Sequence, residues 1–450
     1  MMTNENAQTY KAWTLNNFKE IEQAKYLSEK DIEAVEVVGQ VLPFKTNNYA
    51  TDELIDWENA AADPMFSLHF PRKDMLFEHD YDTVKTLLRK YQKTEDPRDK
   101  EALDSAVEVI RLSLNPHPSG QSHNVPVFNG TKLNGLQHKY RETVLLFPNQ
   151  GQTCYAYCSF CFRWPQFSKI SSMADSKFAI KEDYETYMDY IKSKPDVTDV
   201  LFTGGDPMTM KTSVFSKYID RLLEDDMKQI KTIRIGTKAL AHWPYRFTTD
   251  ADADDMIGMF EKVVAADKHL AVMAHFNHPK EMETKAVREA IHRILCTNAQ
   301  IRTQSPVLNH INNDPTSWAQ MWRKQTDLGC IPYYMFVARD TGAKHYFELP
   351  LERAQQVFRE AYQSVSGICR TVRGPIMSDH AGKIQILGTS EVYGKKIFVL
   401  RFIQGRNPDW VAKPFFAEYN PNATWFDQLT PAFGEKEFFF ESEIEDYLNP

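Results

Sequence analysis

From residue 143 onward, short apolar runs alternate with stretches whose apolar residues recur at helical spacing. A short apolar run is typical of a buried strand, and a period of 3.6 residues is typical of a helix that covers a sheet. The predicted strands are residues 143–147, 199–203, 232–236, 270–276, 301–308 and 332–338, and the predicted helices are residues 182–193, 214–225, 252–266, 283–296, 316–328 and 351–365. Six strands that alternate with six helices predict an α/β fold, a partial (β/α)6 barrel around a parallel sheet.

Two regions of different character flank this alternation. Residues 1–130 predict an N-terminal helical region, with helical spacing over 10–26 and helices at 80–91 and 100–114. Ser28 followed by Asp31 is typical of the capped start of a further helix that runs toward residue 41. Residues 390–450 are rich in aromatic side chains and predict a C-terminal extension, whose residues 438–440 are expected to pack onto the barrel. The expected domains are therefore 1–130, 131–389 and 390–450.

Composition and charge limit the function classes. The chain has 450 residues, 42% of them hydrophobic and 25% charged, which is typical of a globular protein. A net charge of −8 argues against a general nucleic-acid binder, which would be basic. No run of about 18 apolar residues predicts a membrane span. The polar first residues lack the apolar core of a signal peptide, so a cytoplasmic location is expected.

Three of the six cysteines lie within eight residues, Cys154, Cys158 and Cys161, in the spacing C-x3-C-x2-C. Thiolates are soft ligands that suit iron–sulfur clusters and zinc. No fourth cysteine is near, so a cluster of four irons would keep one iron open to a small molecule. A zinc site of three cysteines and one histidine is the alternative. The run follows the first predicted strand, which places it at the carboxyl ends of the strands, where barrel active sites lie.

The residues that end the next strands are expected to face the same pocket. Gly204, Gly205 and Asp206 end the second strand, where glycines allow a ligand to approach the backbone and an acidic side chain can accept from an ammonium group. An ordinary turn is the alternative. Thr237 and Lys238 end the third strand, and His275 and His278 end the fourth.

The cysteine spacing, with the aromatic Phe160 before the last cysteine, resembles the signature of the radical S-adenosylmethionine (SAM) superfamily. The resemblance implies a [4Fe–4S] cluster on the three cysteines, with SAM on the open iron. It also implies that SAM is cleaved by reduction to a radical that abstracts hydrogen from a substrate, with electrons from a donor such as flavodoxin or ferredoxin. Gly204, Gly205 and Asp206 resemble the motif that contacts the SAM amino group.

Further stretches narrow the resemblance to the lysine 2,3-aminomutase family. They fall in the family's order over about residues 139–387, and they are Cys161-Phe-Arg163, Thr203-Gly-Gly-Asp-Pro207, His275-Phe-Asn-His-Pro279, Gln304-Ser305, Pro332-Tyr-Tyr334 and Gly382-Lys383-Ile384. That family combines the SAM radical with pyridoxal 5′-phosphate (PLP) and moves an amino group between adjacent carbons of an amino acid. The resemblance therefore implies an isomerase.

The same resemblance assigns the remaining site residues. It implies Lys383 as the lysine that holds PLP as a Schiff base, with Lys139, Tyr140 and Gln304 beside the cofactor. It also implies that Arg163 pairs with the substrate carboxylate. Two departures concern PLP: only Gly382 remains of the glycine-rich run before the lysine, and a second family arginine falls on Thr143.

The predicted substrate pocket departs most from lysine-specific members. Their two aspartates against the lysine ammonium fall on Arg339 and Ile376. A cation and an apolar group would repel lysine, so we expect a small-molecule substrate that is a non-lysine, acidic amino acid held by Arg339. Arg339 paired with Asp340 or Asp379 is the alternative. No cysteine follows Cys369, so the zinc that supports oligomers in some relatives is not expected, and a homo-oligomer stays open.

Two other functions compete with the aminomutase. One keeps the cluster and SAM but uses no PLP, and performs dehydrogenation or epimerisation on another substrate. The second is a non-enzymatic iron–sulfur or partner-binding protein. An aminomutase would bind PLP covalently at Lys383, whereas the PLP-independent radical enzyme would not. Both enzymes would cleave SAM under reducing conditions, whereas the non-enzymatic protein would not.

Overall fold

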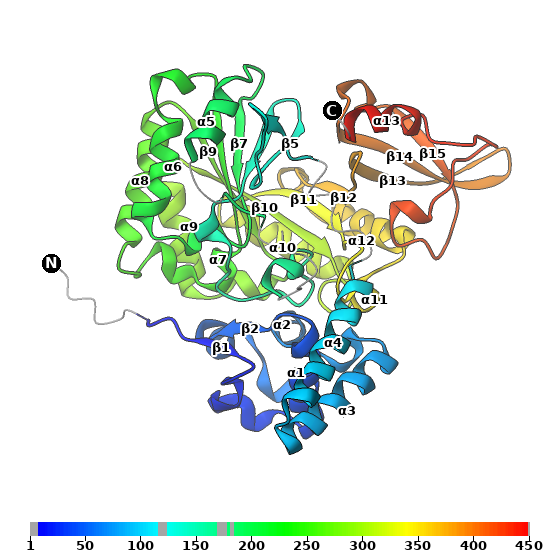
Figure 1. Ribbon diagram of the computed structural model, residues 1–450. Helices are drawn as coiled ribbons and strands as arrows, with labels where there is room; N and C mark the ends of the chain where they lie inside the picture. Colours follow the sequence, from blue (N-terminus) through cyan, green and yellow to red (C-terminus); the bar gives the residue numbers. More distant parts are fainter. Residues whose placement is uncertain (1–7, 116–123, 169–177, 181–183, 449–450) are drawn as a thin grey trace.

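The sheet that the sequence predicts is present and extends at both ends. The structure is a computed structural model that describes residues 8–115, 124–168, 178–180 and 184–448. An eleven-stranded sheet runs from β5 to β15, each strand beside its neighbour in sequence (Figure 1). Its barrel strands are β6 (Thr143–Leu146), β7 (Asp199–Phe202), β8 (Thr232–Thr237), β9 (His269–His275), β10 (Gln300–Val307), β11 (Ile331–Val337) and β12 (Arg373–Ser378). From β6 to β12 every neighbouring pair is parallel.

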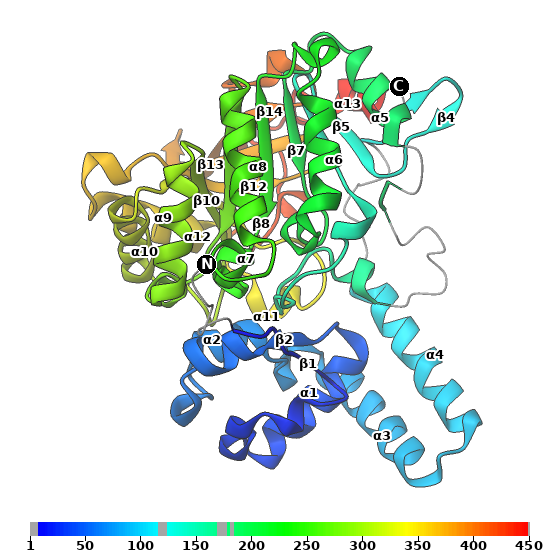
Figure 2. The ribbon, with the colours of Figure 1, turned by 90° about the vertical axis from the view of Figure 1, so that its left-hand side faces the viewer.

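Helices follow the strands and cover the outside of the sheet (Figure 2). They are α5 (Tyr184–Lys192), α6 (Thr212–Leu222), α8 (Ala253–Ala265), α9 (Lys285–Cys296), α10 (Pro315–Asp327) and α12 (Leu351–Gln363). Strand residues alternate between the two faces. In β8, Ile233 and Ile235 are fully buried in the core, whereas Arg234 and Gly236 line the barrel interior. All six predicted strands and helices are therefore confirmed, and the fold is a partial α/β barrel.

The N-terminal region lies across one end of the barrel (Figures 1 and 2). Its helices are α1 (Glu29–Val41), α2 (Pro64–His69), α3 (Glu78–Thr94) and α4 (Pro97–Ser113). Ser28 caps α1 in a capping box with Asp31, as predicted. The predicted helical stretch at 10–26 is wrong. It contains strand β1 (Ala12–Thr14), which pairs with β2 (Lys45–Asn47), and two turns of 3-10 helix. The side chain of Asn17 accepts from the backbone N–H of Thr14, a local bond that competes with helix formation.

Sequence reasoning missed the barrel strand β12 and the strands at the two edges of the sheet. β5 (Leu136–Tyr140) pairs antiparallel with β6, so Lys139 and Tyr140 lie on a strand. At the other edge, β13 (Gly382–Val392), β14 (Lys395–Gly405) and β15 (Pro414–Glu418) continue the sheet antiparallel beyond β12. The expected domain boundary at residue 390 lies inside β13.

The C-terminal aromatic residues form a hydrophobic core of their own. Phe438 and Phe440 are buried there with Phe402, Trp410 and Phe415. They pack on β14 and β15, just before the last helix, α13 (Glu441–Leu448), rather than mainly on the barrel as expected.

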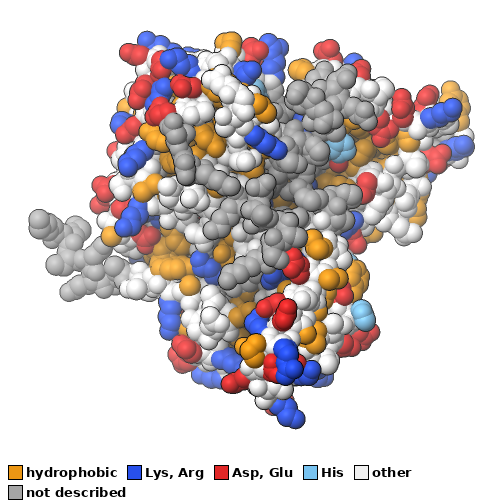
Figure 3. Space-filling view, in the orientation of Figure 1, with side chains coloured by type: hydrophobic (Ala, Val, Ile, Leu, Met, Phe, Trp, Pro, Cys, Tyr) orange, Lys and Arg blue, Asp and Glu red, His pale blue; other side chains and the backbone are white. Residues whose placement is uncertain are grey.

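Side chains of both charges are interspersed over the face shown in Figure 3, in keeping with the small net charge of −8. Two short elements matter for the site, the helices α7 (Ala239–His242) and α11 (Lys344–Phe347), because both follow barrel strands. None of the helices in the described ranges is long and apolar enough to cross a membrane.

Candidate active site

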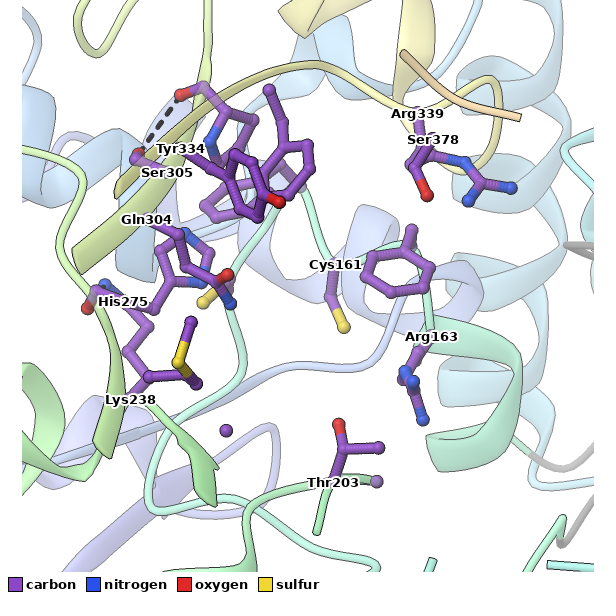
Figure 4. Close-up of a pocket in the computed structure, with 18 of the residues that line it drawn as sticks. Cys161, Arg163, Thr203, Lys238, His275, Gln304, Ser305, Tyr334, Arg339 and Ser378 are labelled. Atoms are coloured by element: carbon purple, nitrogen blue, oxygen red, sulfur yellow. Dashed lines mark hydrogen bonds between the residues drawn. The ribbon is translucent and has the colours of Figure 1, made fainter. Parts of the chain in front are cut away.

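A cavity of about 390 Å³ opens at the carboxyl ends of the barrel strands. The predicted cluster, cofactor and substrate residues line it, namely Lys139, Tyr140, Cys154, Cys158, Cys161, Arg163, Gly204, Gly205, Asp206, Gln304, Arg339 and Lys383. His278, which the sequence also expects to face the pocket, is not among the described lining residues. In Figure 4, Cys161 projects into the middle of the cavity, with Arg163 and Arg339 on one side and His275 and Gln304 on the other. The structure thus brings together residues that are far apart in the sequence.

The three clustered cysteines lie on the loop between β6 and α5. Burial raises the pKa of Cys158 to about 12 and that of Cys161 to about 11. Burial also raises the pKa of Cys154, and the nearby Asp206 carboxylate and the other two thiols raise it further. Three clustered thiols that repel one another as thiolates become stable anions on a positive centre such as iron. Over the described residues, no three His, Cys, Asp or Glu side chains converge as the ligands of one metal ion.

The turn after β7 supports the start of the cysteine loop. A Cβ atom on Gly204 would lie 2.2 Å from Nε2 of Gln152, and one on Gly205 would lie 2.4 Å from the backbone oxygen of Thr153. The N–H of Asp206 donates to that same oxygen at 2.7 Å. Gly205 is therefore required by the close approach of the Thr153 backbone, and Gly204 by its φ of +138°, whatever ligand the cavity takes.

The carboxylate of Asp206 is occupied by the protein itself. It accepts from the hydroxyl of Thr237 at 2.7 Å and from the backbone N–H groups of Lys238 at 2.8 Å and Met208 at 3.0 Å. Burial raises the pKa of Asp206 to about 6 in spite of these bonds. The side chain is thus turned toward the ends of β7 and β8, and the main chain around it faces the cavity.

Three further residues that the sequence placed at the strand ends are also held internally or buried. The ammonium group of Lys238 donates to Glu281 at 2.6 Å and to Asn277 at 2.9 Å. His278 accepts from a backbone N–H at 3.3 Å. His275 does line the cavity, where its Nε2 is buried without a hydrogen-bond partner in the described chain. Burial holds the pKa of His275 well below its usual value, so the ring is neutral.

Two arginines have unsatisfied nitrogens toward the cavity. Nη1 of Arg163 is buried and has no hydrogen-bond partner among the described residues, and its guanidinium lies 4.5 Å from the ring centre of Phe147. Burial lowers the pKa of Arg163 to about 10. The guanidinium of Arg339 lies between the rings of Phe162, at 5.5 Å, and Trp425, at 5.4 Å.

Arg339 has only a loose ionic neighbour. Its Nε is 3.5 Å from the carboxylate of Asp340 and forms no hydrogen bond in the described structure. Asp379, the other expected partner, instead lies 2.7 Å from Nδ1 of His380. The contribution of Trp425 could not be predicted, because it comes from a segment 86 positions away in the sequence.

At the other end of the cavity, Lys383 lies on β13, directly opposite Gln404 of β14. Its amine donates to the side-chain oxygen of Gln404 and lies 4.6 Å from the ring centre of Tyr140 and 5.6 Å from that of Tyr334. Burial, followed by the charges of Lys139, Arg234 and Arg373, holds the pKa of Lys383 well below its usual value. The amine is therefore held toward its neutral, nucleophilic form.

Lys139 completes this end of the cavity. Its amine donates to the backbone oxygen of Asp379, and burial lowers its pKa to about 7. Sequence reasoning missed Gln404 and Arg234. Gln404 becomes a neighbour through strand pairing, and Arg234 through its inward position on β8.

Comparison with known proteins gives sequence relatives but no matching protein-family model. A "Putative L-lysine 2,3-aminomutase" of Aquifex aeolicus is 33% identical over 304 residues, which is 68% of this chain and 76% of that protein. The L-lysine 2,3-aminomutase of Escherichia coli is 25% identical over 61% of this chain and 72% of its own length. The glutamate 2,3-aminomutase of Clostridioides difficile is 28% identical over 47% of this chain and 46% of its own length.

A solved radical SAM methyltransferase from Sphaerobacter thermophilus superposes with a TM-score of 0.35 at 14% identity, over 53% of this chain and 68% of that one. The partial barrel, the cysteine loop at its strand ends and the aminomutase relatives define an enzyme of the radical SAM superfamily. Within it, the chain belongs to the lysine 2,3-aminomutase family, whose named members are isomerases. Membership of the superfamily implies a [4Fe–4S] cluster and SAM.

Proposed function

We propose that this enzyme is a PLP-dependent radical SAM aminomutase that moves the amino group of an acidic, non-lysine amino acid from carbon 2 to carbon 3. The observation that carries the proposal is the state of Lys383. A half-buried lysine that donates to Gln404 and lies against the rings of Tyr140 and Tyr334, with its pKa held well below its usual value, lines the same cavity as three clustered cysteines. An electron-transfer protein would have no use for a lysine amine in that place.

Cys154, Cys158 and Cys161 are the proposed cluster ligands. Their thiols are half-buried, near one another and on one loop, which fits three thiolates on three irons of a cluster. SAM is proposed to lie against the main chain of residues 204–205. Because the Asp206 carboxylate already accepts three hydrogen bonds, its part is to fix this turn rather than to bind an ammonium group.

PLP is proposed to bind covalently to Lys383. Burial holds the pKa of the amine well below its usual value, and the rings of Tyr140 and Tyr334 supply flat surfaces beside it. Lys139 supplies an amine that can donate to the phosphate, and Gln304 lines the same cavity. When bound, PLP supplies the electron-accepting ring that makes migration of an amino group between adjacent carbons accessible.

Arg163 and Arg339 are the proposed substrate-binding residues. Each has a guanidinium nitrogen that lacks a hydrogen-bond partner in the described chain, and a carboxylate satisfies such a nitrogen with a charge-assisted bond. Two cations in one cavity wall oppose an ammonium side chain and favour a second carboxylate. A relative named glutamate 2,3-aminomutase is in line with this substrate class.

The first test is covalent attachment of PLP to the anaerobically reconstituted enzyme. The parent protein, incubated with PLP and reduced with borohydride, is expected to carry PLP on the peptide that contains Lys383. Lys383→Ala is expected to lose the label. Lys344→Ala, which removes another lysine of the same cavity, is the matched control and should keep it.

If the parent forms no borohydride-stable adduct while its cluster is intact, the proposed use of PLP is wrong and the PLP-independent radical enzyme is favoured.

The second test is a panel of amino acids under reducing conditions with SAM. We expect turnover of an acidic amino acid and none of lysine. Loss of one partner of a buried charged pair costs about 2 to 5 kcal/mol, so Arg339→Ala should lower kcat/KM for the acidic substrate by at least about thirtyfold. Conversion of lysine to β-lysine by the parent would refute the substrate class.

A further inference from the structure

The N-terminal region binds the back of the cysteine loop, on the side away from the cavity. Six hydrogen bonds connect residues 10–68 with residues 154–159. The contacts are Lys45 Nζ to Cys154 O at 2.7 Å, Tyr10 Oη to Tyr155 O at 2.6 Å, Asn47 Nδ2 to Tyr155 O at 3.3 Å, Tyr157 N to Lys45 O at 2.7 Å, Ser159 N to Leu68 O at 3.1 Å and Ser159 Oγ to Ser67 O at 2.6 Å.

Lys45 is the charged member of this contact. It is half-buried, and its ammonium group lies 5.8 Å from the ring centre of Tyr10 and 5.6 Å from that of Tyr157. No carboxylate pairs with it in the part of the chain that the structure describes. Other lysines near the barrel end do have such a partner: Lys238 pairs with Glu281 and Lys280 with Asp63.

A half-buried cation without an anion is unfavourable unless an anion lies close by. The negative groups that the cysteine loop offers are its thiolates, and Cys154, whose own backbone oxygen Lys45 binds, is one of them. A four-iron cluster on three thiolates is an anion, and reduction adds one electron and thus one more negative charge. A fixed positive charge beside it stabilises the reduced form more than the oxidised form.

We propose that Lys45 is a positioning residue of the N-terminal region that raises the reduction potential of the cluster and fixes Cys154 through its backbone oxygen. The inference rests on the proposed ligation by Cys154, Cys158 and Cys161. In the reaction concerned, one electron passes from a low-potential donor to the cluster. Lys45 acts on that step by its charge and takes no part in bond making or breaking.

The test is an anaerobic redox titration of the full-length reconstituted protein with dithionite, followed by the electron paramagnetic resonance signal of the reduced cluster. Lys45→Gln keeps an N–H donor for the Cys154 oxygen but removes the charge. We expect its reduction equilibrium to fall by about tenfold, which is about 59 mV for a one-electron couple. Lys45→Arg should stay near the parent value. Lys11→Met, which removes an exposed lysine that lies over the ring of Trp13, is the matched control and should not shift it.

The iron and sulfide contents of the reconstituted protein are measured first. They separate the proposed ligation of the cluster from the proposed role of Lys45. A parent protein without a four-iron cluster contradicts the proposed ligands. A parent that has its cluster, with an unchanged potential in Lys45→Gln, overturns the role of Lys45. If Lys45→Gln loads less cluster, the titration still decides, because the signal reports only the loaded fraction.

Discussion

Gly205→Ala tests the packing that supports the cysteine loop. A Cβ atom at this position would lie 2.4 Å from the backbone oxygen of Thr153 and 2.5 Å from its backbone nitrogen. Ordinary contacts begin at 3.4 Å, so Thr153 would have to move by about 1 Å. Thr153 directly precedes Cys154, and backbone cannot yield as the end of a flexible side chain can. Overpacking of this kind costs about 1 to 3 kcal/mol.

The assay is iron content after anaerobic reconstitution, together with the midpoint of thermal unfolding. Gly205→Ala should bind at least about twofold less iron and unfold at a lower temperature than the parent. Gly258→Ala is the matched control, because it adds the same methyl group in α8 where nothing lies within 4 Å. Alanine in a helix interior should stabilise that variant by about 0.5 to 1 kcal/mol. Parent-like iron binding and stability in Gly205→Ala would refute the argument that the glycine is required by space.

Two further substitutions test the network beside this turn. Lys238→Met leaves the carboxylate of Glu281 buried without its cation. The free energy of unfolding, measured in urea, should therefore fall by about 3 to 5 kcal/mol. The double variant Lys238→Met with Glu281→Gln should recover part of that loss. Asp206→Asn removes a carboxyl whose pKa burial raises from 3.8 to about 6. The folded parent keeps that proton up to about pH 6 whereas the unfolded chain loses it near pH 4, so parent stability falls between these values. The variant should therefore gain on the parent by up to about 3 kcal/mol from pH 4 to 6.5, and a pH-independent difference would contradict the burial argument.

The barrel was predictable because local pattern and tertiary role agree in it. The strands β6 to β11 are short apolar runs and each covering helix has an apolar face, so the period alone defines them. The seventh barrel strand, β12, was not predicted. The misses lie where tertiary pairing decides. Residues 136–140 are a mixed sequence that becomes a strand only because β6 offers a free edge. Residues 10–26 have helical spacing, but Asn17 and the pairing with β2 favour other structure.

In the candidate site, too, some residues were predictable from local sequence and others depend on tertiary structure. Residues with a chemical signature, such as the three cysteines and Lys383, were placed in one cavity by reasoning from motifs and from the position of strand ends. What the sequence could not supply is the direction of each side chain. Asp206 and Lys238 lie at the predicted place, but their charged groups point into the protein. Gln404 and Trp425 enter from strands and turns whose pairing no local pattern encodes.

The pairing of the positively charged residues that line the cavity bears on the charge of the proposed substrate. Several cations of the lining already have partners: Arg234 pairs with Asp199, Lys238 with Glu281 and Lys344 with Glu348. Arg339 also has an ion pair, with Asp340 at 3.5 Å, but Arg163 and Arg339 each keep a guanidinium nitrogen without a hydrogen bond within the described chain. Lysine would bring another cation to this wall, whereas a substrate with two carboxylates could satisfy both arginines. The proposed preference for an acidic amino acid therefore rests on which guanidinium nitrogens lack a hydrogen bond in the described chain.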